Sequence, residues 1–359
     1  MLYQLLIDWT ADVSFFNVFR YFTFRIILAA LTSMVLWFVF GPKFIAAVKC
    51  FQIKQYVRVD GPASHHKKNG TPTMGGVMVL AASLCSCLMW CDVFSTPVRL
   101  MWAVVLGYAL IGLQDDWLKI RRRRNEGLTG RQKLAAQAVI GLAAGYALWA
   151  SPGFSPTLTA PGLKNFVLDL GPLYIPFSAL VLVGATNAVN LTDGLDGLAI
   201  GPIIMAAGTY MIFAYCAGNS VIARHLQLTG VPEASEVAVV LASLIGSSLG
   251  FLWYNCHPSQ LFLGDVGSLS LGAALGLAAL IVKQELMLII VGGIFVVEAL
   301  SVIMQVSFFK ATHGRRIFLM APIHHHFELK GWPEAKITVR FWIIAIILGL
   351  AGLSTLKLR

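Results

Sequence analysis

Two carboxylates and two amides are packed into the stretch 186–197, which reads TNAVNLTDGLDG. The stretch separates two long apolar runs, so Asn187, Asn190, Asp193 and Asp196 gather at one end of both. Asn and Asp beside Gly favour a turn, because Gly allows positive φ and the short side chains bond nearby backbone. Standing alone, this pattern is as typical of a polar turn between two helices as of an active site.

Other polar clusters also lie at the ends of apolar runs. Asp115 and Asp116 close one run, where an acid opposes the helix dipole and needs a cation, either Mg²⁺ or the basic loop that follows. Asp265 follows Gly264 at the start of another run, which fits an ordinary N-cap as well as a Mg²⁺ ligand. Taken together, five acidic positions near one interface favour a magnesium site for a phosphorylated substrate.

Three further features leave both a structural and a functional interpretation open. The consecutive His324, His325 and His326 lack the i, i+4 spacing of a helical metal site, and suit either a solvated loop or a phosphate- or sugar-binding site. The Gly/Thr/Pro turn 68–76 lacks the Walker pattern. Glu298 lies inside an apolar run, where an ionisable residue is either functional or bonded to an interrupted helix.

The elements that position these residues are membrane helices. The chain has 359 residues, 57% hydrophobic and 12% charged, whereas soluble domains carry about a quarter charged residues. Its apolar runs are about 20 residues long, which fits helices and not the ~10-residue alternation of a β-barrel. We therefore predict an all-α, polytopic integral membrane protein, with one domain over 1–359 and ten apolar segments at about 22–46, 73–91, 97–118, 132–150, 173–192, 197–217, 235–254, 265–283, 286–308 and 338–356.

Basic residues set the expected orientation. The net charge of +10 is concentrated in the connections after the first, third and ninth segments, which indicates orientation and anionic ligands, not nucleic acid. The positive-inside rule places those connections in the cytoplasm, so ten spans put both termini outside. Arg20 and Arg25, close to the first segment, argue mildly for the opposite orientation. With this topology every polar cluster above faces the cytoplasm and the outer connections hold no comparable cluster, which predicts an enzyme site in a cytoplasmic cleft.

The motifs together resemble the polyprenyl-phosphate N-acetylhexosamine-1-phosphate transferase superfamily, and within it the phospho-N-acetylmuramoyl-pentapeptide transferases. The resemblance runs from about Arg58 to Glu334, and the triple His with its flanks is its most specific part. The matching stretches are DGPxSH at 60–65, GTPTMGG at 70–76, the Asp115–Asp116 pair, NAVNLTDGLDGLA at 187–199, NxHPxxxFLGDVGSLxLG at 255–272 and APIHHHFE at 321–328.

The resemblance implies an activity and a location. Members transfer phospho-MurNAc-pentapeptide from UDP-MurNAc-pentapeptide to undecaprenyl phosphate, giving lipid I and UMP for peptidoglycan synthesis, and require Mg²⁺. Their fold consists of ten transmembrane helices, and they lie in the lipid of the bacterial inner membrane. They often form homodimers.

Site residues also carry over by position. The resemblance makes Asp115, Asp116, Asp265, Asn190, Asp193 and the run His324, His325 and His326 catalytic, with Asp265 and Asp193 on the metal. It assigns substrate binding to Lys68, Thr73, Lys133, Asn187, Gly194, Leu195, Asp196, Asn255, Phe262 and Gln305. Glu298 matches a polar position around the cleft.

Alternatives from other classes remain to be compared. The same superfamily includes GlcNAc-1-phosphate transferases, against which the triple His argues. A transporter for a lipid-linked precursor needs ionisable groups through the membrane depth, and a scaffold leaves the acidic positions unexplained. Within the transferase interpretation, direct attack by the lipid phosphate competes with a covalent phospho-Asp intermediate.

Overall fold

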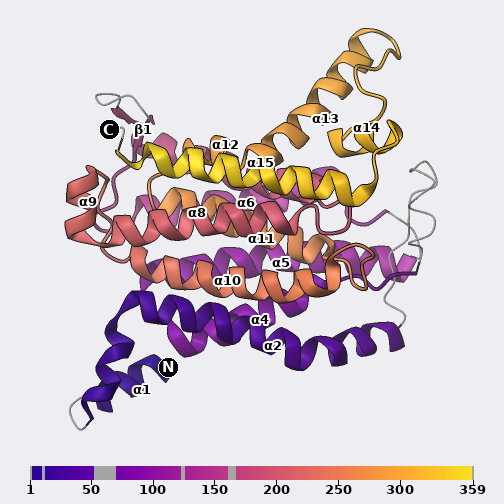
Figure 1. Cartoon of the computed structure of the whole chain (residues 1–359). Helices are drawn as coiled ribbons and strands as arrows, with labels where there is room; N and C mark the ends of the chain where they lie inside the picture. The colour runs from indigo at the N-terminus through magenta and orange to yellow at the C-terminus, as the bar shows by residue number, and fades with distance from the viewer. Residues whose placement is uncertain (1, 10–12, 52–69, 123–125, 161–166, 358–359) are drawn as a thin grey trace.

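The computed structural model describes residues 2–9, 13–51, 70–122, 126–160 and 167–357 (Figure 1). Within these ranges the elements are helices and one short antiparallel pair, β1 (Thr157–Thr159) and β2 (Val167–Asp169), joined by turns and loops. In a bilayer each backbone polar group must bond within the segment, which long apolar runs achieve only as helices. The all-α polytopic prediction is confirmed.

Eight described helices are long and apolar enough to cross a membrane, by length and composition. They are α2 (Phe22–Cys50), α5 (Thr96–Arg122), α7 (Tyr174–Thr192) with the preceding turn η3 (Gly171–Leu173), α8 (Ile200–Gly218), α10 (Ala234–Asn255), α11 (Gly264–Ile281), α13 (Gly293–Ala311) and α15 (Glu334–Ser354). The remaining helices are α1 (Leu2–Asp8), η2 (Ser14–Arg20), α4 (Gly75–Trp90), α6 (Gly130–Trp149), α9 (Ser220–Leu226), α12 (Met287–Val291), α14 (Ile323–Leu329) and η4 (Thr355–Lys357).

Each expected apolar segment corresponds to a helix, with one interruption. The ninth segment is divided at Gly292 into the short α12 and the longer α13. The fourth segment begins where the sequence places a capping box, in which Thr129 and Gln132 each bond the other's backbone at the start of α6. The count of ten membrane crossings stays a prediction, because α4 has only 16 residues and α6 is not among the eight.

One helix occupies the centre of the bundle. Figure 1 shows the long helices side by side, and α11 packs against α4, α5, α7 and α8. In its most apolar window 89% of α11 is buried, compared with 28% of α13. Figure 1 also shows α13 leaving the bundle, with α14 lying beside it. The central helix therefore has partners on all sides, whereas α13 has few.

The bundle has two chemically distinct ends. The end of α5, the start of α6, the end of α7 and the start of α11 meet at one end, which we call the inner end because the sequence predicts that it faces the cytoplasm. Helix α1, the end of α15, α9 and β1 lie at the opposite or outer end (Figure 1). Both terminal helices thus reach the same end, as an even number of crossings requires.

The expectation that the outer end holds no comparable polar cluster is wrong. Arg25 in α2 is fully buried and pairs with Glu236 of α10 at 2.7 Å, while Lys283 and Glu285 form a second buried pair at 2.7 Å. The charge of Arg25 is neutralised inside the bundle, so this residue does not act as a loop charge against the predicted orientation. A separation of 211 residues between Arg25 and Glu236 hides their pairing from the sequence.

Candidate active site

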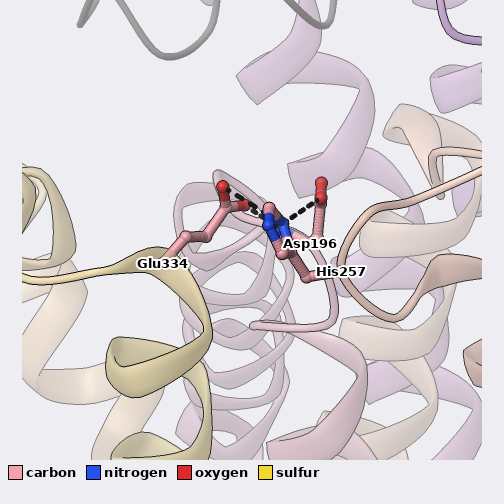
Figure 2. A group of neighbouring side chains, drawn as sticks. All are labelled: Asp196, His257 and Glu334. Atoms are coloured by element: carbon pink, nitrogen blue, oxygen red, sulfur yellow. Dashed lines mark hydrogen bonds and ion pairs between the residues drawn. The ribbon is translucent and has the colours of Figure 1, made fainter.

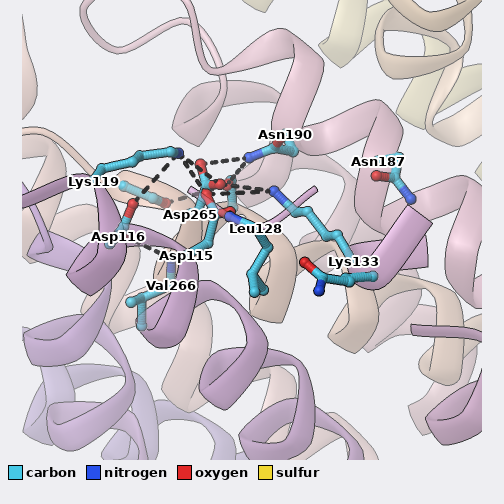
Figure 3. A network of polar contacts seen from close by, with 12 residues as sticks. Asp115, Asp116, Lys119, Leu128, Lys133, Asn187, Asn190, Asp265 and Val266 are labelled. Carbon is cyan, nitrogen blue, oxygen red and sulfur yellow. Dashed lines mark hydrogen bonds and ion pairs between the residues drawn. The ribbon is translucent and has the colours of Figure 1, made fainter. Parts of the chain in front are cut away.

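Three carboxylates converge at the inner end. Asp115 and Asp116 lie in the last turns of α5, and Asp265 lies in the first turn of α11 (Figure 3). One oxygen from each lies within 4.8 Å of one from each of the others, and both Asp115 and Asp116 are buried. The adjacent Asp115 and Asp116 both reach this cluster, although neighbouring helical residues project about 100° apart.

Backbone donors hold two of these carboxylates in place. The Val266 N–H donates to Asp116 Oδ2 at 3.2 Å, and the Leu128 N–H donates to Asp115 Oδ1 at 2.8 Å. Gly264 precedes Asp265 with φ +75°, a conformation that other residues rarely adopt, and a Cβ there would lie 2.8 Å from Asp116 Oδ2. Asp265 itself makes no cap to α11, so the ordinary N-cap interpretation does not describe it.

Two lysines supply the positive charge. Lys119 Nζ lies 2.6 Å from Asp115 Oδ2, 3.0 Å from Asp265 Oδ2 and 3.8 Å from Asp116 Oδ1. Lys133 Nζ, from the first turn of α6, lies 2.7 Å from Asp265 Oδ2 and 4.0 Å from Asp115 Oδ2. Three carboxylates therefore share two ammonium groups, so the acids of the cluster outnumber its cations.

Amides from α7 border the cluster. Asn190 Nδ2 donates to Asp265 Oδ1 at 3.0 Å and to Ser268 Oγ at 2.8 Å. Asn187, one turn earlier, donates through Nδ2 to Gln137 Oε1 at 2.6 Å and to the Val183 carbonyl at 2.8 Å. In Figure 3 Asn187 stands apart from the carboxylates, so the two amides of the NAVN motif have different partners.

Asp193 lies just after α7 and beside the same cluster. Burial, together with the neighbouring carboxylates of Asp265 and Asp196, raises the pKa of Asp193 to about 7. An acid in such surroundings gains from a cation, because a positive charge offsets both the loss of water and the like charges. Asp193 is therefore placed to respond to a metal ion bound near Asp265.

The three consecutive histidines point to different partners. His324 is fully buried, with Nδ1 3.1 Å from Glu298 Oε1 of α13 in a contact that is not aligned as a hydrogen bond. A Cβ at Gly194 would collide with His324 Nε2, so the ring packs directly against the turn that carries Asp193. His325 contacts Glu328 at 2.8 Å, and His326 Nδ1 accepts the Leu319 N–H at 3.1 Å. The sequence leaves Glu298 either functional or bonded within an interrupted helix. In the structure its carboxylate faces His324, a buried partner on another element.

Two of the predicted substrate-binding residues, Asp196 and Asn255, hold loops together. The Asp196 carboxylate accepts from the Ser259 N–H and hydroxyl, and its Oδ2 lies 3.0 Å from His257 Nδ1 (Figure 2). Glu334 Oε2 lies 3.6 Å from the same nitrogen. Asn255 accepts the Gly197 N–H and donates to the Leu261 carbonyl. These contacts tie the turn after α7 to the loop after α10 and to the start of α15.

The other predicted binding residues have varied positions. Thr73 is buried beside Gly264, and the Phe262 backbone pairs with Pro72 and Gly75, which holds the Gly/Thr/Pro turn against α11. Leu195 packs in a small apolar cluster under α15. Gln305 bonds the backbone of Ile317 and Phe318 and so secures the connection after α13. Lys68 and the DGPxSH motif lie outside the described residues.

Sequence reasoning missed several members of the network. Lys119 follows Asp115 by four residues and Asp116 by three, the spacings at which helical side chains meet, and this signal could have found it. Ser268, which accepts a hydrogen bond from Asn190, lies three residues after Asp265 and therefore on the same face of α11. The partners Gln137 and His257 come from elements distant in the sequence, and local spacing gives no sign of them.

Comparisons with known proteins agree on one family. Residues 98–283, just over half of the chain, match the model of glycosyl transferase family 4. Residues 68–80 match signature 1 of the phospho-N-acetylmuramoyl-pentapeptide-transferases. Proteins of that name are similar over the full length of both chains: that of Syntrophus aciditrophicus is 52% identical, and that of Desulfatibacillum aliphaticivorans is 54% identical.

Proposed function

The chain belongs to the phospho-N-acetylmuramoyl-pentapeptide-transferase family, and on that premise we propose the reaction that it performs. It transfers phospho-MurNAc-pentapeptide from UDP-MurNAc-pentapeptide to undecaprenyl phosphate, giving lipid I and UMP. The reaction takes place at the cytoplasmic face of the bacterial inner membrane. The observation that supports this site best is the convergence of Asp115, Asp116 and Asp265 with Lys119 and Lys133 at one end of the bundle.

The position of the cluster suits both substrates. One substrate is a soluble, multiply charged nucleotide, and the other is a phosphate on a long lipid. A site at the ends of membrane-spanning helices meets both, whereas a site at mid-depth would exclude the nucleotide. The exposed apolar faces of α13 and α15 offer the lipid chain a path beside the site.

The donor set fits Mg²⁺. Mg²⁺ takes oxygen ligands and commonly binds through one or two carboxylates plus substrate phosphates. We assign it to Asp265, with Asp193 as a further carboxylate, in a cluster where acids outnumber the two lysines. Bound there, the ion would neutralise charge on the diphosphate.

The protein's own groups then mainly position and neutralise, which is what phosphoryl transfer requires. An oxygen of the lipid phosphate attacks the β-phosphorus, a new P–O bond forms, and the bond from that phosphorus to the bridging oxygen breaks to release UMP. A phosphate monoester with a second pKa of about 6 is already a competent nucleophile, so no protein nucleophile is needed. Asp115 orients the lipid phosphate or takes its remaining proton, and Lys119 and Lys133 offset the charge of the phosphates.

Residues around this centre hold the remainder of the nucleotide. We propose that the uracil binds near Phe262, Asn255 and Asp196, with Leu195, Gly194 and Lys68 completing the pocket. The His324–His326 run adds donors for the phosphates or sugar, and Asn190 and Asp116 organise the carboxylates. Thr73 and Gln305 fix the two loops that border the site.

The test is UMP release by the purified protein in detergent, with UDP-MurNAc-pentapeptide, undecaprenyl phosphate and Mg²⁺. We expect turnover that stops with EDTA and that UDP-GlcNAc does not support. Turnover with UDP-GlcNAc alone would contradict the substrate assignment. Exchange of labelled UMP into the nucleotide without lipid acceptor, or a trapped phospho-Asp, would contradict direct attack.

A further inference from the structure

Gln137 is a fully buried amide that the proposed mechanism does not use. It lies in α6 one turn after Lys133, and the other buried residues of that helix are Gly141, Ala144, Gly145 and Leu148. The Tyr108 hydroxyl donates to its backbone carbonyl at 2.9 Å, which fixes α6 against α5 at this level. A buried amide in an otherwise apolar helix face costs stability unless its polar atoms are used.

The direction of the hydrogen bonds around Gln137 is determined by chemistry. The Val183 carbonyl can only accept, so the Asn187 atom 2.8 Å from it must be the amide nitrogen. The same nitrogen lies 2.6 Å from the Gln137 side chain, so the Gln137 atom that faces it must be the oxygen. This chain of donors and acceptors leaves Gln137 Nε2 buried without a partner among the described residues.

These hydrogen bonds fix which way the Asn187 amide faces. Both of its N–H groups are directed to protein acceptors, so its Oδ1 is the atom left for another group, and no described residue donates to it. The side chain is half-buried, one turn from Asn190, which bonds Asp265. Asn187 therefore offers an acceptor beside the site, which matches a hydroxyl or N–H donor and not a phosphate oxygen.

We propose that Gln137 is a positioning residue that orients Asn187 so that its amide oxygen accepts a hydrogen bond from the sugar portion of the nucleotide substrate. The proposal rests on the proposed function. Without the Gln137 oxygen, the Asn187 amide keeps only its hydrogen bond to the Val183 carbonyl, so its orientation is less firmly held. One hydrogen bond of this kind corresponds to a change of up to about tenfold in an equilibrium or rate.

The experiment compares two substitutions of similar shape. Gln137→Met removes the acceptor, and we expect kcat/KM for UDP-MurNAc-pentapeptide to fall about tenfold while the KM for undecaprenyl phosphate stays within about twofold. Gln137→Glu keeps an oxygen facing Asn187 and should recover activity to within about threefold of the wild type. Gln284→Met makes the same change at a buried glutamine of the outer end and serves as the matched control, with wild-type kinetics expected.

A second variant tests whether Gln137 acts through Asn187. In an Asn187→Ala background, Gln137→Met should cause no further loss, because its partner is already absent. The proposal would be overturned if Gln137→Met lowered kcat/KM equally in the wild-type and Asn187→Ala backgrounds, or lowered it equally for both substrates. Recovery of Gln137→Met activity by higher Mg²⁺ would also overturn it. If the wild type releases no UMP, the proposed function fails; if the wild type is active and Gln137→Met matches it, only this inference fails.

Discussion

The two ends of the bundle bury charge in opposite ways. At the outer end, Arg25 and Glu236 form a bidentate pair at 2.7 and 3.1 Å, and Lys283 pairs with Glu285 while Tyr174 donates to the same carboxylate. Each cation there has one anion. At the inner end, three carboxylates share Lys119 and Lys133, and Asp193 lies close by.

This difference separates structural charge from functional charge. A matched buried pair with extra hydrogen bonds has no need of a ligand, and it fixes the packing of its helices. A cluster in which acids outnumber cations is the one that we expect a bound cation to stabilise. Burial of charged residues is thus common to both ends, and the charge balance distinguishes them.

The largest expected effect comes from Asp265. Asp265→Asn removes the carboxylate that both lysines and Asn190 contact, and we expect kcat to fall by about a thousandfold. The thermal unfolding midpoint should stay close to that of the wild type, because Asp115 remains in contact with both lysines. Glu233→Gln, the same change at an exposed carboxylate of the outer end, should leave turnover unchanged. Loss of folding in Asp265→Asn would mean that the inner cluster, like the outer pairs, is structural.

The outer pairs should show the converse behaviour. Glu236→Gln leaves Arg25 buried without its counter-charge, which should destabilise the protein by about 3–5 kcal/mol. Thermal unfolding in detergent measures the effect, and kcat per folded molecule should not change. The double variant Arg25→Met/Glu236→Leu should regain most of the stability. A specific loss of kcat in either variant would break the distinction between the two ends.

Glu298 is a buried carboxylate outside the cluster of Asp115, Asp116 and Asp265, and its replacement tests whether it contributes to activity. Glu298→Gln replaces the carboxylate oxygen that lies 3.1 Å from His324 Nδ1, and we expect kcat to fall by about tenfold, because the buried imidazole loses the polar group that faces it. If Glu298 acts through His324, the same change in a His324→Gln background should add little. Additive losses would show that the two residues act separately.

The smallest expected effect is on the stability of the metal-free protein. Asp193 has a pKa of about 7 when folded, above its usual value, so the folded state binds the proton more tightly than the unfolded state. Stability from this group is present at low pH and is lost as the pH rises from about 4 to about 7. In EDTA, Asp193→Asn should therefore raise the unfolding midpoint more at pH 8 than at pH 5. An equal shift at both pH values would contradict an uncompensated carboxylate.

The fold was largely readable from local patterns. Apolar runs of about 20 residues predict helices wherever they occur, because each helix satisfies its own backbone, and every expected segment lies on one. The interruption of the ninth segment at Gly292 was one of the two interpretations that the sequence left open. The departure of α13 from the bundle was not readable, because it depends on which neighbours pack against that helix.

The sequence by itself determined the class of protein, the helical segments, the family and which residue types carry the chemistry. Only the tertiary structure decided their pairing: that Lys119 also reaches Asp265, that Glu298 faces His324, that Asn187 bonds Gln137, and that Arg25 is neutralised by Glu236. The physical reason is that helix formation is set within a segment, whereas pairing between charges and amides depends on helix packing, which brings together residues of different helices as far as 211 positions apart.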